Sequence, residues 1–398
     1  MMKISLFGYG KTNKALAKRL APCDIYDDYF SEDSSDELGN RLLNPRHFSA
    51  QNSELEVATP GIPPNHPLIL QAKNLISEYD IFAASMPFSI WISGTNGKTT
   101  TTEMLAHLLA PKGAQCGGNI GTPLAELDER ASMWILETSS FTLHYTRFAR
   151  PNLYLLLPLS EDHISWHGTY EAYVEAKLKP LKMMRDKEIA IVPKQFLNTP
   201  ASCELIGYED SRHLAQIMGI AVEKIAFKEP FLLDSLLALS ACKILYGEIP
   251  YDSINSFQIG AHKLFEFFDS ANRLWVDDSK ATNVDASIAA LRRYQNMGIR
   301  IILGGDDKGA DLSPLFEKLK NLRASVYAIG SNARKIAAFC EESKIPYEIC
   351  NTLKTAVEKI KTELKIGEVA LLSPAAASLD QFSSYKERGE RFCEYARS

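Results

Sequence analysis

The stretch Trp91–Ala110, "WISGTNGKTTTTEMLAHLLA", joins a short apolar run to a glycine-rich turn and then to an amphipathic helix. The apolar stripe of this helix is formed by Met104, Leu105, Leu108 and Leu109. Between a strand and a helix such a turn can hold phosphate, because backbone N–H groups at the helix N-terminus point at the phosphate oxygens. The general phosphate-loop spacing places its first glycine where this chain has Ile92. The stretch therefore predicts a strand, a turn and a helix around a phosphate site of unusual spacing.

The polar residues of the turn predict contacts with a nucleotide. Lys98 can bridge the β- and γ-phosphates, and the hydroxyl of Thr99 can ligate Mg²⁺. The competing interpretation is an ordinary turn between a strand and a helix that binds no ligand. The residues expected at the nucleotide are Gly94, Thr95, Asn96, Gly97, Lys98, Thr99 and Thr100.

Length and composition bound the class of protein. A chain of 398 residues with 45% hydrophobic residues predicts two or three packed domains. The formal net charge is −5 and the basic residues are scattered, which argues against nucleic acid or a membrane surface as a partner. The seven cysteines form no C-x-x-C pair, and the chain has neither a signal peptide nor an apolar run of transmembrane length. We expect a cytoplasmic protein that acts as a monomer.

Short apolar runs alternate with helical patterns along the chain, which predicts an α/β fold with mostly parallel sheets. Each run leads into polar or glycine-rich residues, and in parallel sheets ligands bind beyond the carboxyl ends of the strands. The runs are "KISLF", "SIWIS", "MWIL", "LYLLLPL", "RLWV", "RIIL" and "VALL". Boundaries at the proline-containing segment near Met86 and around Gly260 predict three domains, 1–86, 87–260 and 261–398. The acidic segment 31–37 is expected to be a loop.

Three further residues that follow or face the central strands are candidates for a metal site. Glu137 ends an apolar run, where a carboxylate serves either as a Mg²⁺ ligand or as a helix N-cap. His163 follows a leucine-rich strand. Its side chain either only supports the fold or takes part in the site. Lys177 falls on the apolar stripe of its helix, whereas Lys179 and Lys182 fall off it. A buried lysine amine has a lowered pKa and can add CO₂ to form an anionic carbamate, although a lysine at the edge of the stripe can also extend to solvent.

The amino-terminal turn Gly8–Asn13 begins like a dinucleotide-binding fingerprint but has Asn13 in place of the third glycine. The acidic pair Asp27–Asp28 follows the next apolar run at a distance suited to a ribose. A nucleotide site of some kind is therefore expected here, without a specific indication of NAD.

Taken together, these motifs resemble the Mur ligase family of peptidoglycan synthesis over nearly the whole chain. "GTNGKTT" is the form that the phosphate loop takes in that family, which accounts for the spacing at Ile92. The other similar motifs, in order, are "GGNIGTPL" (117–124), "LETSSFTL" (136–143), "EDHISWH" (161–167), "EAKLKPL" (175–181), "DDSKATN" (277–283), "GGDDKGADLSPL" (304–315) and "LLSPAAASLDQFSSYKERG" (371–389). The last three are most similar to the family member that adds D-glutamate.

The resemblance implies three domains: a Rossmann-like UDP-binding domain, a phosphate-loop ATPase domain and a Rossmann-like carboxy-terminal domain. It implies ATP-dependent addition of D-glutamate to UDP-N-acetylmuramoyl-L-alanine through an acyl phosphate, with two Mg²⁺ ions. Lys98, His163 and Lys177 match the catalytic positions, and Thr99, Glu137, His163 and a carbamylated Lys177 match the metal ligands. Lys263 and Asp278 match further ATP-binding positions. The positions matched to the two other substrates are Gly10, Lys11, Thr12, Asp27, Thr59, Gly61 and Asn119 for the UDP-sugar, and Lys280, Thr282, Lys308, Ser378, Leu379 and Tyr385 for D-glutamate.

The chain also departs from the family pattern. Residues 228–234 replace a Gly-x-His-Asn-x-x-Asn segment that helps hold the adenosine, Lys263 stands where the family has arginine, and Tyr385 where it has phenylalanine. The alternatives that remain are a folylpolyglutamate synthase, which lacks a domain before the phosphate loop, an NAD-dependent oxidoreductase and a nucleotide-gated regulatory protein.

Overall fold

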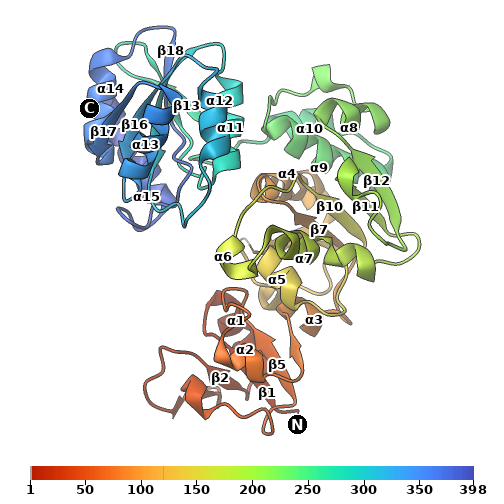
Figure 1. Ribbon diagram of the computed structural model, residues 1–398. Coiled ribbons are helices and arrows are strands. Elements are labelled where there is room, and N and C mark those ends of the chain that lie inside the picture. Colours follow the sequence, from red (N-terminus) through yellow and green to blue (C-terminus); the bar gives the residue numbers. More distant parts are fainter. Residues whose placement is uncertain (1, 120) are drawn as a thin grey trace. The chain divides into compact units, whose positions relative to one another are not determined.

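The computed structural model describes residues 2–119 and 121–398, and the chain forms two compact units, Met1–Phe257 and Gln258–Ser398. The first unit contains two six-stranded sheets and the second unit contains one (Figure 1). The division between the units lies within a few residues of the boundary expected at Gly260. A further domain boundary inside the first unit, near residue 86, stays a proposal, and each of the two proposed domains there is centred on its own sheet.

The first sheet has the order β3-β4-β2-β1-β5-β6. Its strands are parallel except for β3, which runs antiparallel to β4. The strands are β1 (Ile4–Phe7), β2 (Asp24–Tyr26), β3 (Ser34–Ser35), β4 (Arg41–Leu43), β5 (Leu55–Ala58) and β6 (Leu75–Ile76). The helices of this segment are α1 (Lys11–Leu20), η1 (Pro45–His47), α2 (Pro67–Gln71) and α3 (Glu78–Ile81).

The expectation that the acidic segment 31–37 is a loop was wrong in part, because it contains the edge strand β3. The carboxylate of Asp36 accepts hydrogen bonds from the backbone N–H groups of Leu38 and Asn40, both at 2.9 Å. These bonds close a tight turn that folds the segment back onto β4. A short edge strand flanked by acidic side chains is also a common way of preventing sheet-to-sheet association.

The second sheet, of order β12-β11-β10-β7-β9-β8, is parallel throughout. Its strands are β7 (Ser89–Ser93), β8 (Ala114–Gly118), β9 (Met133–Glu137), β10 (Leu153–Leu156), β11 (Ile189–Pro193) and β12 (Glu204–Tyr208). All five residues of β7 are buried, as expected for a central parallel strand. Because β7 lies between β10 and β9, the turns that follow these three strands meet at one edge of the sheet.

Helices cover both faces of this second sheet, and α4 packs against α9 while α5 packs against α7. They are α4 (Lys98–Leu109), α5 (Ser140–Tyr145), α6 (Ile164–His167), α7 (Tyr170–Met183), α8 (Ser211–Ile217), α9 (Phe231–Tyr246) and α10 (Tyr251–Ser256), with 3-10 turns η2 (Ala110–Lys112), η3 (Leu124–Glu126), η4 (Lys194–Phe196) and η5 (Val222–Lys224).

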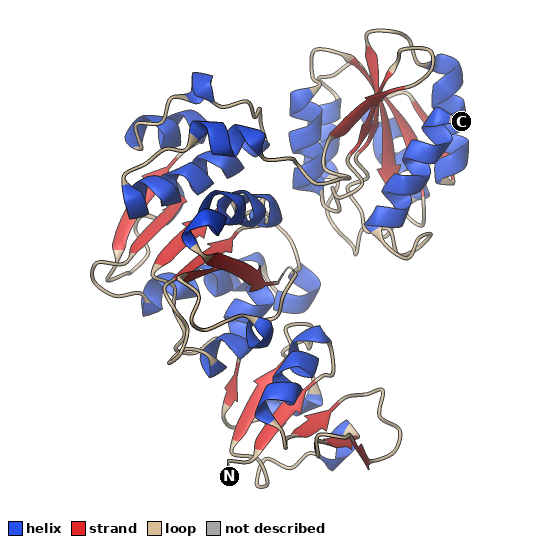
Figure 2. Ribbon diagram, turned by 180° about the vertical axis from the view of Figure 1, so that it is seen from behind, coloured by secondary structure: helices blue, strands red, loops and turns tan. Residues whose placement is uncertain are grey.

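The carboxy-terminal unit is a sheet of order β13-β14-β18-β15-β16-β17 with helices on both faces (Figure 2). Its strands are parallel except for the edge strand β13, which runs antiparallel to β14. The strands are β13 (Phe265–Phe268), β14 (Leu274–Asp277), β15 (Gly298–Gly304), β16 (Ala324–Ile329), β17 (Tyr347–Asn351) and β18 (Glu368–Leu372). The helices are α11 (Val284–Arg293), α12 (Ser313–Leu319), α13 (Ala333–Ser343), α14 (Leu353–Glu363) and α15 (Tyr385–Arg397).

The predicted α/β class with mostly parallel sheets is confirmed. Each of the seven apolar runs identified from the sequence forms a strand: β1, β7, β9, β10, β14, β15 and β18. Among the described residues, no helix is long and apolar enough to cross a membrane.

Helix α3 joins the first sheet to the second through three consecutive buried polar side chains. The carboxylate of Asp80 accepts hydrogen bonds from the backbone N–H groups of the segment Arg147–Ala149, at 2.8–2.9 Å. The Tyr79 hydroxyl donates to the carbonyl oxygen of Glu137 at 3.1 Å, and a carboxylate oxygen of Glu78 accepts from Ala125 N at 3.4 Å. One short helix therefore anchors three separate segments of the second sheet.

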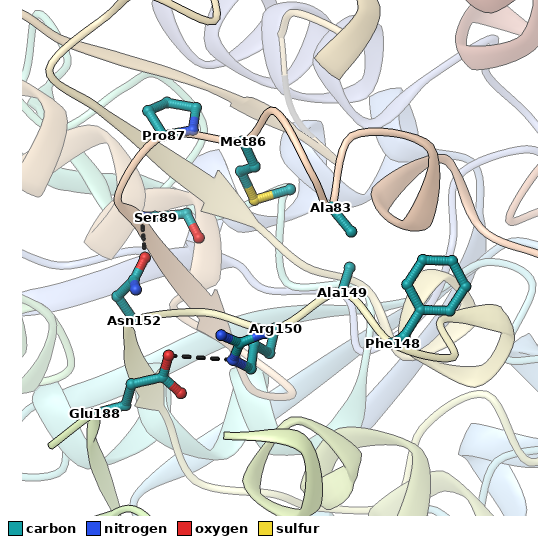
Figure 3. A pocket seen from close by; sticks show the side chains of 9 residues that line it. All are labelled: Ala83, Met86, Pro87, Ser89, Phe148, Ala149, Arg150, Asn152 and Glu188. Carbon is teal, nitrogen blue, oxygen red and sulfur yellow. Dashed lines mark hydrogen bonds and ion pairs between the residues drawn. The ribbon is translucent and has the colours of Figure 1, made fainter. Parts of the chain in front are cut away.

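A pocket of about 100 Å³ lies close to this junction and is lined by Ala83, Met86, Pro87, Ser89, Phe148, Ala149, Arg150, Asn152 and Glu188 (Figure 3). Arg150 Nε donates to Glu188 Oε1 at 3.2 Å, and Asn152 Oδ1 accepts from Ser89 N at 2.8 Å. Ser89 begins β7, so the pocket lies at the amino ends of the strands. Ligands of parallel sheets bind at the opposite edge, and the pocket is therefore not a candidate active site.

The buried carboxyl of Glu78 gives a testable dependence of stability on pH. Burial raises the pKa of Glu78 to about 8 from the ordinary value of 4.5. Since the raised value belongs to the folded state, this group stabilises the fold most at low pH, and its contribution is lost as the pH rises from about 5 to about 8.

We expect Glu78→Gln to reduce the loss of stability between about pH 5 and pH 8, because glutamine keeps an acceptor for Ala125 N but has no proton to release. The thermal midpoint of the variant relative to wild type should therefore rise between about pH 5 and pH 8. Glu32→Gln, at an exposed position, is the control. A difference in midpoint that stays constant across this range would show that Glu78 ionises normally in the folded protein.

Candidate active site

The glycine-rich turn between β7 and α4 has the geometry of a phosphate-binding loop. Gly97 is the N-cap of α4 with φ of 82°, and Gly94 has φ of 148°. A Cβ atom on Gly94 would lie 2.5 Å from Leu157 Cβ, and one on Gly97 would lie 2.4 Å from Asp234 Oδ1. Only glycine fits either position. The turn thus brings backbone N–H groups and the positive end of α4 to the carboxyl edge of the sheet, where an anion is stabilised.

Lys98 lies over this loop. Its Nζ donates to the carbonyl oxygens of Gly94, at 2.9 Å, and Thr95, at 2.7 Å. Thr95 is fixed in turn, because its hydroxyl contacts the Tyr173 hydroxyl at 2.7 Å and donates to Ser160 O at 3.1 Å. The predicted nucleotide residues of the turn are therefore adjacent and ordered, with Thr99 and Thr100 in the first turn of α4.

Sequence reasoning assigned no role to Asp234, which the structure places against the same turn. Asp234 lies in the first turn of α9 and is buried, and it accepts a hydrogen bond from the hydroxyl of Thr101 at 3.2 Å. It belongs to the segment 228–234 that departs from the family pattern. An acid within the apolar stretch "FLLDSLLALS" was the available signal, because a buried carboxylate needs polar partners.

Lys177 faces inward, as the helical stripe predicts, and is 1% exposed. Its Nζ donates to Gly94 O at 2.9 Å and to Ser93 Oγ at 3.3 Å, and it lies 5.0 Å from the centre of the Tyr173 ring. Burial lowers the pKa of Lys177 well below its ordinary value, and the charge of Lys98 lowers it further. The amine thus lies beside the phosphate loop, where its surroundings disfavour the protonated form.

Lys179 lies outside the buried residues of α7, as expected from the sequence, but it is not fully exposed. It is half-buried, and its Nζ donates to the carbonyl oxygen of His144 at 2.7 Å. The physical reason is that α7 packs on α5, whose last turn supplies this acceptor. Lys182 is exposed and pairs with Glu175 at 3.1 Å, in agreement with the expectation.

Glu137 has one satisfied and one unsatisfied carboxylate oxygen. Oε1 accepts from Asn119 Nδ2 at 2.6 Å, whereas Oε2 is buried and has no hydrogen-bond partner among the described residues. A buried carboxylate oxygen without a donor is costly unless a cation neutralises it, so the environment fits a bound Mg²⁺. The motif 117–124 that carries Asn119 includes Ile120, which lies outside the described residues.

His163 is the N-cap of α6 and adopts a left-handed conformation with φ of 56°. Its ring lies 4.6 Å from the ring centre of Phe141 and 6.5 Å from that of Tyr173, and Nε2 lies 3.6 Å from Asp162 Oδ2. Among the described residues, no group of three or more His, Cys, Asp or Glu side chains could hold a metal ion. A cation here would need further oxygen ligands, such as those of a substrate phosphate or a carbamate.

The residues predicted for the UDP-sugar lie at the carboxyl edge of the first sheet, except for Asn119, which follows β8 of the second sheet. Gly10 is the N-cap of α1, and Lys11 and Thr12 begin this helix. The Asp27 carboxylate accepts from Tyr9 N at 2.5 Å and Tyr29 N at 2.9 Å. A pocket of about 60 Å³ opens here, lined by Gly8, Tyr26, Asp27, Asp28, Pro45, Ile62, His66 and Leu68. Thr59 lies beside it, because a Cβ atom on Gly8 would lie 2.5 Å from Thr59 Oγ1, and Gly61 precedes the lining residue Ile62.

Lys11 connects this edge with the second sheet, because its Nζ donates to the carbonyl oxygen of Gly121. Two segments far apart in the sequence, the amino-terminal turn and the motif 117–124, therefore meet. Thr122, next to Gly121, accepts a hydrogen bond from Gly118 N at 3.0 Å, and Asn119, next to Gly118, donates to Glu137 Oε1. Glu137 pairs with Ile92 of β7, the strand that leads into the phosphate loop. The first unit thus forms a continuous path from the Lys11 turn to the phosphate loop.

In the carboxy-terminal unit the predicted residues follow β14. Asp278 is buried and accepts from Ser373 Oγ at 2.7 Å and Leu264 N at 3.2 Å, and burial raises the pKa of Asp278 to about 8. Lys280 and Thr282 are exposed, and Lys280 Nζ lies 4.3 Å from the centre of the Tyr385 ring. Lys263 lies in the turn before β13 and is half-buried.

A second group in this unit lies where β15 and β18 end. Asp306 and Ala377 form an antiparallel bridge, which places the loop that carries Lys308 against the loop that carries Ser378. Lys308 is exposed with φ of 50°, Ser378 is buried and Leu379 is 69% exposed. The structure therefore brings together an exposed lysine and a hydroxyl from distant motifs.

Arg388 was not singled out from the sequence, although it lies in the last motif. It is 1% exposed, and its guanidinium donates to Ser279 Oγ and Ser279 O, both at 2.9 Å, and to Ala376 O at 3.1 Å. It thereby ties the segment that follows β14 to the segment that follows β18. The signal in the sequence was weak, because an arginine on a helix rich in charged residues is normally exposed.

Residues 92–206 match the Mur ligase middle domain, and residues 265–376 match the Mur ligase, glutamate ligase domain. The chain is 55% identical to a UDP-N-acetylmuramoylalanine–D-glutamate ligase of Campylobacter jejuni subsp. jejuni serotype O:23/36 (strain 81-176), over 99% of both chains. It is 46% identical to the enzyme of the same name from Helicobacter pylori (strain HPAG1), over 98% of both chains.

The fold is similar to that of MurF ligase from Thermotoga maritima in complex with ADP, with a TM-score of 0.60, 16% identity and coverage of 99% of this chain and 94% of that one. It is also similar to E. coli FolC in complex with DHPP and ADP, with a TM-score of 0.56, 16% identity and coverage of 80% of this chain and 96% of that one. The two matched domains and the identity to full-length relatives agree with each other. The chain is therefore a member of the Mur ligase family, in the group of UDP-N-acetylmuramoylalanine–D-glutamate ligases.

Proposed function

We propose that the protein catalyses the ATP-dependent addition of D-glutamate to UDP-N-acetylmuramoyl-L-alanine. The observation that carries the proposal is the path through the first unit, in which Lys11 contacts Gly121, Asn119 contacts Glu137, and Lys98 and Lys177 both contact Gly94. This path supports a UDP-sugar and a nucleotide triphosphate held close enough to react. The names of the full-length relatives supply the identity of both substrates.

The chemistry requires activation of a carboxylate, because oxide is a poor leaving group in amide formation. The carboxylate of the UDP-sugar substrate attacks the γ-phosphate of ATP, which gives an acyl phosphate and ADP. The amine of D-glutamate then attacks the acyl carbon and releases inorganic phosphate. The ammonium of Lys98 and the N–H groups at the start of α4 stabilise the charge on the transferring phosphoryl group.

Two Mg²⁺ ions fit this proposal, and when bound they would neutralise charge on the phosphates. The orphaned Oε2 of Glu137 and the hydroxyl of Thr99 would hold one ion, and His163 with a carbamate on Lys177 would hold the other. Burial of Lys177 beside the phosphate loop lowers the pKa of its amine, which supports the carbamate because CO₂ adds only to an unprotonated amine.

For D-glutamate we propose Lys308 and Ser378 of the second group, together with Thr282 and the Lys280–Tyr385 pair from the segments that follow β14 and β18. Acidic substrates need cationic and hydroxyl partners, and the Asp306–Ala377 bridge brings such partners together. Lys263 and Asp278 are proposed to contact ATP. The protein is proposed to act as a cytoplasmic monomer in the synthesis of peptidoglycan precursors, on which cell shape and division depend.

The decisive experiment measures ADP release with and without each of the two other substrates. Only the proposed ligase requires both D-glutamate and UDP-N-acetylmuramoyl-L-alanine. A folylpolyglutamate synthase would respond to a folate and not to the UDP-sugar, and an oxidoreductase or regulatory protein would release no ADP in response to either. ADP formation that is independent of D-glutamate would contradict the proposal.

We expect Lys308→Ala to raise the Michaelis constant for D-glutamate by more than about threefold, because it removes the cation that faces a substrate carboxylate. The Michaelis constant for ATP should change little. Lys344→Ala, at another exposed lysine with positive φ in the same unit, is the matched control. If Lys308→Ala stays within about threefold of wild type, equal to about 0.7 kcal/mol of binding, Lys308 does not hold D-glutamate.

A further inference from the structure

The hydroxyl of Tyr79 contacts the backbone of the strand end that carries the candidate metal ligand. Tyr79 is 2% exposed and packs edge-on against Trp91, with ring centres 4.8 Å apart. Its hydroxyl donates to Glu137 O at 3.1 Å, and the same carbonyl oxygen accepts from Asn119 N at 2.9 Å. The last residue of β9 is thus held by one donor from α3 and another from the motif 117–124.

The space around this contact allows little movement. Gly118 lies beside it with φ of 93°, and a Cβ atom there would lie 2.6 Å from the Tyr79 hydroxyl and 2.5 Å from Glu137 O. The residue after it, Asn119, holds Glu137 twice, by its backbone N–H and by its side chain on Oε1. Any shift of the Glu137 carbonyl would therefore move the carboxylate and its partner together.

Helix α3 itself is fixed on both sides of Tyr79. Asp80 accepts from three backbone N–H groups of Arg147–Ala149, and Ser77 at the N-cap accepts from and donates to this helix in a capping box. Glu78 adds a contact with Ala125 N. Because its neighbours are anchored, the Tyr79 hydroxyl is a rigid donor and not a side chain that adapts to the strand.

From this geometry we propose that Tyr79 is a positioning residue for the Glu137 carboxylate, so that the amino-terminal segment helps to build the metal site of the second sheet. The proposal rests on the proposed function, in which Glu137 ligates Mg²⁺. The hydroxyl holds the carbonyl end of Glu137 and Asn119 holds Oε1, whereas Oε2, which has no hydrogen-bond partner among the described residues, would ligate the cation. A tyrosine that serves only to fill the core would contribute its ring but not its hydroxyl.

The variant Tyr79→Phe separates these two roles, because it keeps the ring against Trp91 and removes only the donor. The matched control is Tyr327→Phe in the carboxy-terminal unit, where a buried tyrosine also donates one hydrogen bond, to Glu363 at 2.6 Å. The probe is Mn²⁺ in the presence of a non-hydrolysable ATP analogue, with free Mn²⁺ measured by electron paramagnetic resonance. ADP formation and the affinity for the UDP-sugar substrate are measured on the same preparations.

We expect Tyr79→Phe to bind Mn²⁺ about threefold to tenfold more weakly and to lower kcat by a similar factor, as expected for loss of one buried hydrogen bond at a positioned group. The dissociation constant of the UDP-sugar substrate should stay within about twofold of wild type. Tyr327→Phe should leave all three quantities unchanged.

Two results would overturn the inference. Unchanged Mn²⁺ binding and kcat in Tyr79→Phe would show that the hydroxyl does not position Glu137. Equal losses of Mn²⁺, UDP-sugar and thermal stability would show that it only supports the fold. Failure of the proposed function is recognised separately, because wild-type protein would then form no ADP in response to D-glutamate and the UDP-sugar.

Discussion

Lys98→Ala is expected to abolish ADP formation, with a rate at least about a hundredfold below wild type, while the affinity for the UDP-sugar substrate stays nearly unchanged. The ammonium of Lys98 lies over the phosphate loop, on the carbonyl oxygens of Gly94 and Thr95. Removing it takes away the positive charge that stabilises the transferring phosphoryl group. Except for Asn119, the predicted UDP-sugar residues lie at the edge of a different sheet, around Asp27 and its pocket.

The two effects are separated by measuring ADP release and, independently, binding of the UDP-sugar substrate by calorimetry. Lys112→Ala is the control, since Lys112 is exposed just beyond the other end of α4. Loss of UDP-sugar binding in Lys98→Ala would contradict the assignment of the two sites to different sheets. Retention of ADP formation would show that the loop does not hold the reacting nucleotide.

The sequence predicted the features that depend on local pattern. The turn between β7 and α4 was recognisable because glycine, lysine and threonine occur at fixed positions between an apolar run and an amphipathic helix. Lys177 was recognisable as a candidate for burial because helical periodicity places it on the apolar stripe, although the same pattern also allowed a lysine that extends to solvent. The strand ends were recognisable because each buried run stops at polar residues.

Features that depend on contacts between distant segments could not be predicted in the same way. The role of Asp234 depends on where α9 packs against the phosphate loop, more than 130 residues away along the chain. Arg388 is buried because its acceptors come from two other loops, and Lys179 is half-buried because α5 ends beside it. In each case the partner, and not the residue type, decides burial, and the partner is known only from the tertiary structure.

Helix α3 likewise shows that sequence patterns do not reveal the residues that support the site. Its residues Glu78, Tyr79 and Asp80 carry no motif, yet they anchor three segments that lead to the strand ends of the second sheet. Motif analysis finds the groups that touch ligands, because their chemistry constrains residue type. It does not find the groups that hold them, because many residue types can donate or accept one hydrogen bond to a backbone.

Lys177→Ala is expected to be nearly inactive, and a small carboxylic acid such as acetate or formate is expected to restore part of the activity. The amine is buried beside the phosphate loop, within hydrogen-bond distance of Gly94 O and Ser93 Oγ. If this amine carries a carbamate that ligates Mg²⁺, the variant loses an anionic ligand and leaves space in which a free carboxylate can take its place. The metal requires the negative charge more than the covalent tether.

The measurement is ADP release by Lys177→Ala across a titration of acetate at constant ionic strength, with Lys182→Ala as the exposed control on the same helix. A lysine that contributes only packing and two hydrogen bonds predicts a modest loss and no rescue by any carboxylate. Retention of more than about a tenth of the wild-type rate would correspond to a loss of less than about 1.4 kcal/mol of transition-state stabilisation. That is too little for removal of a metal ligand, and the carbamate would then be rejected. Rescue that depends on acetate concentration, absent in Lys182→Ala, would instead identify the position next to Gly94 as an anion site.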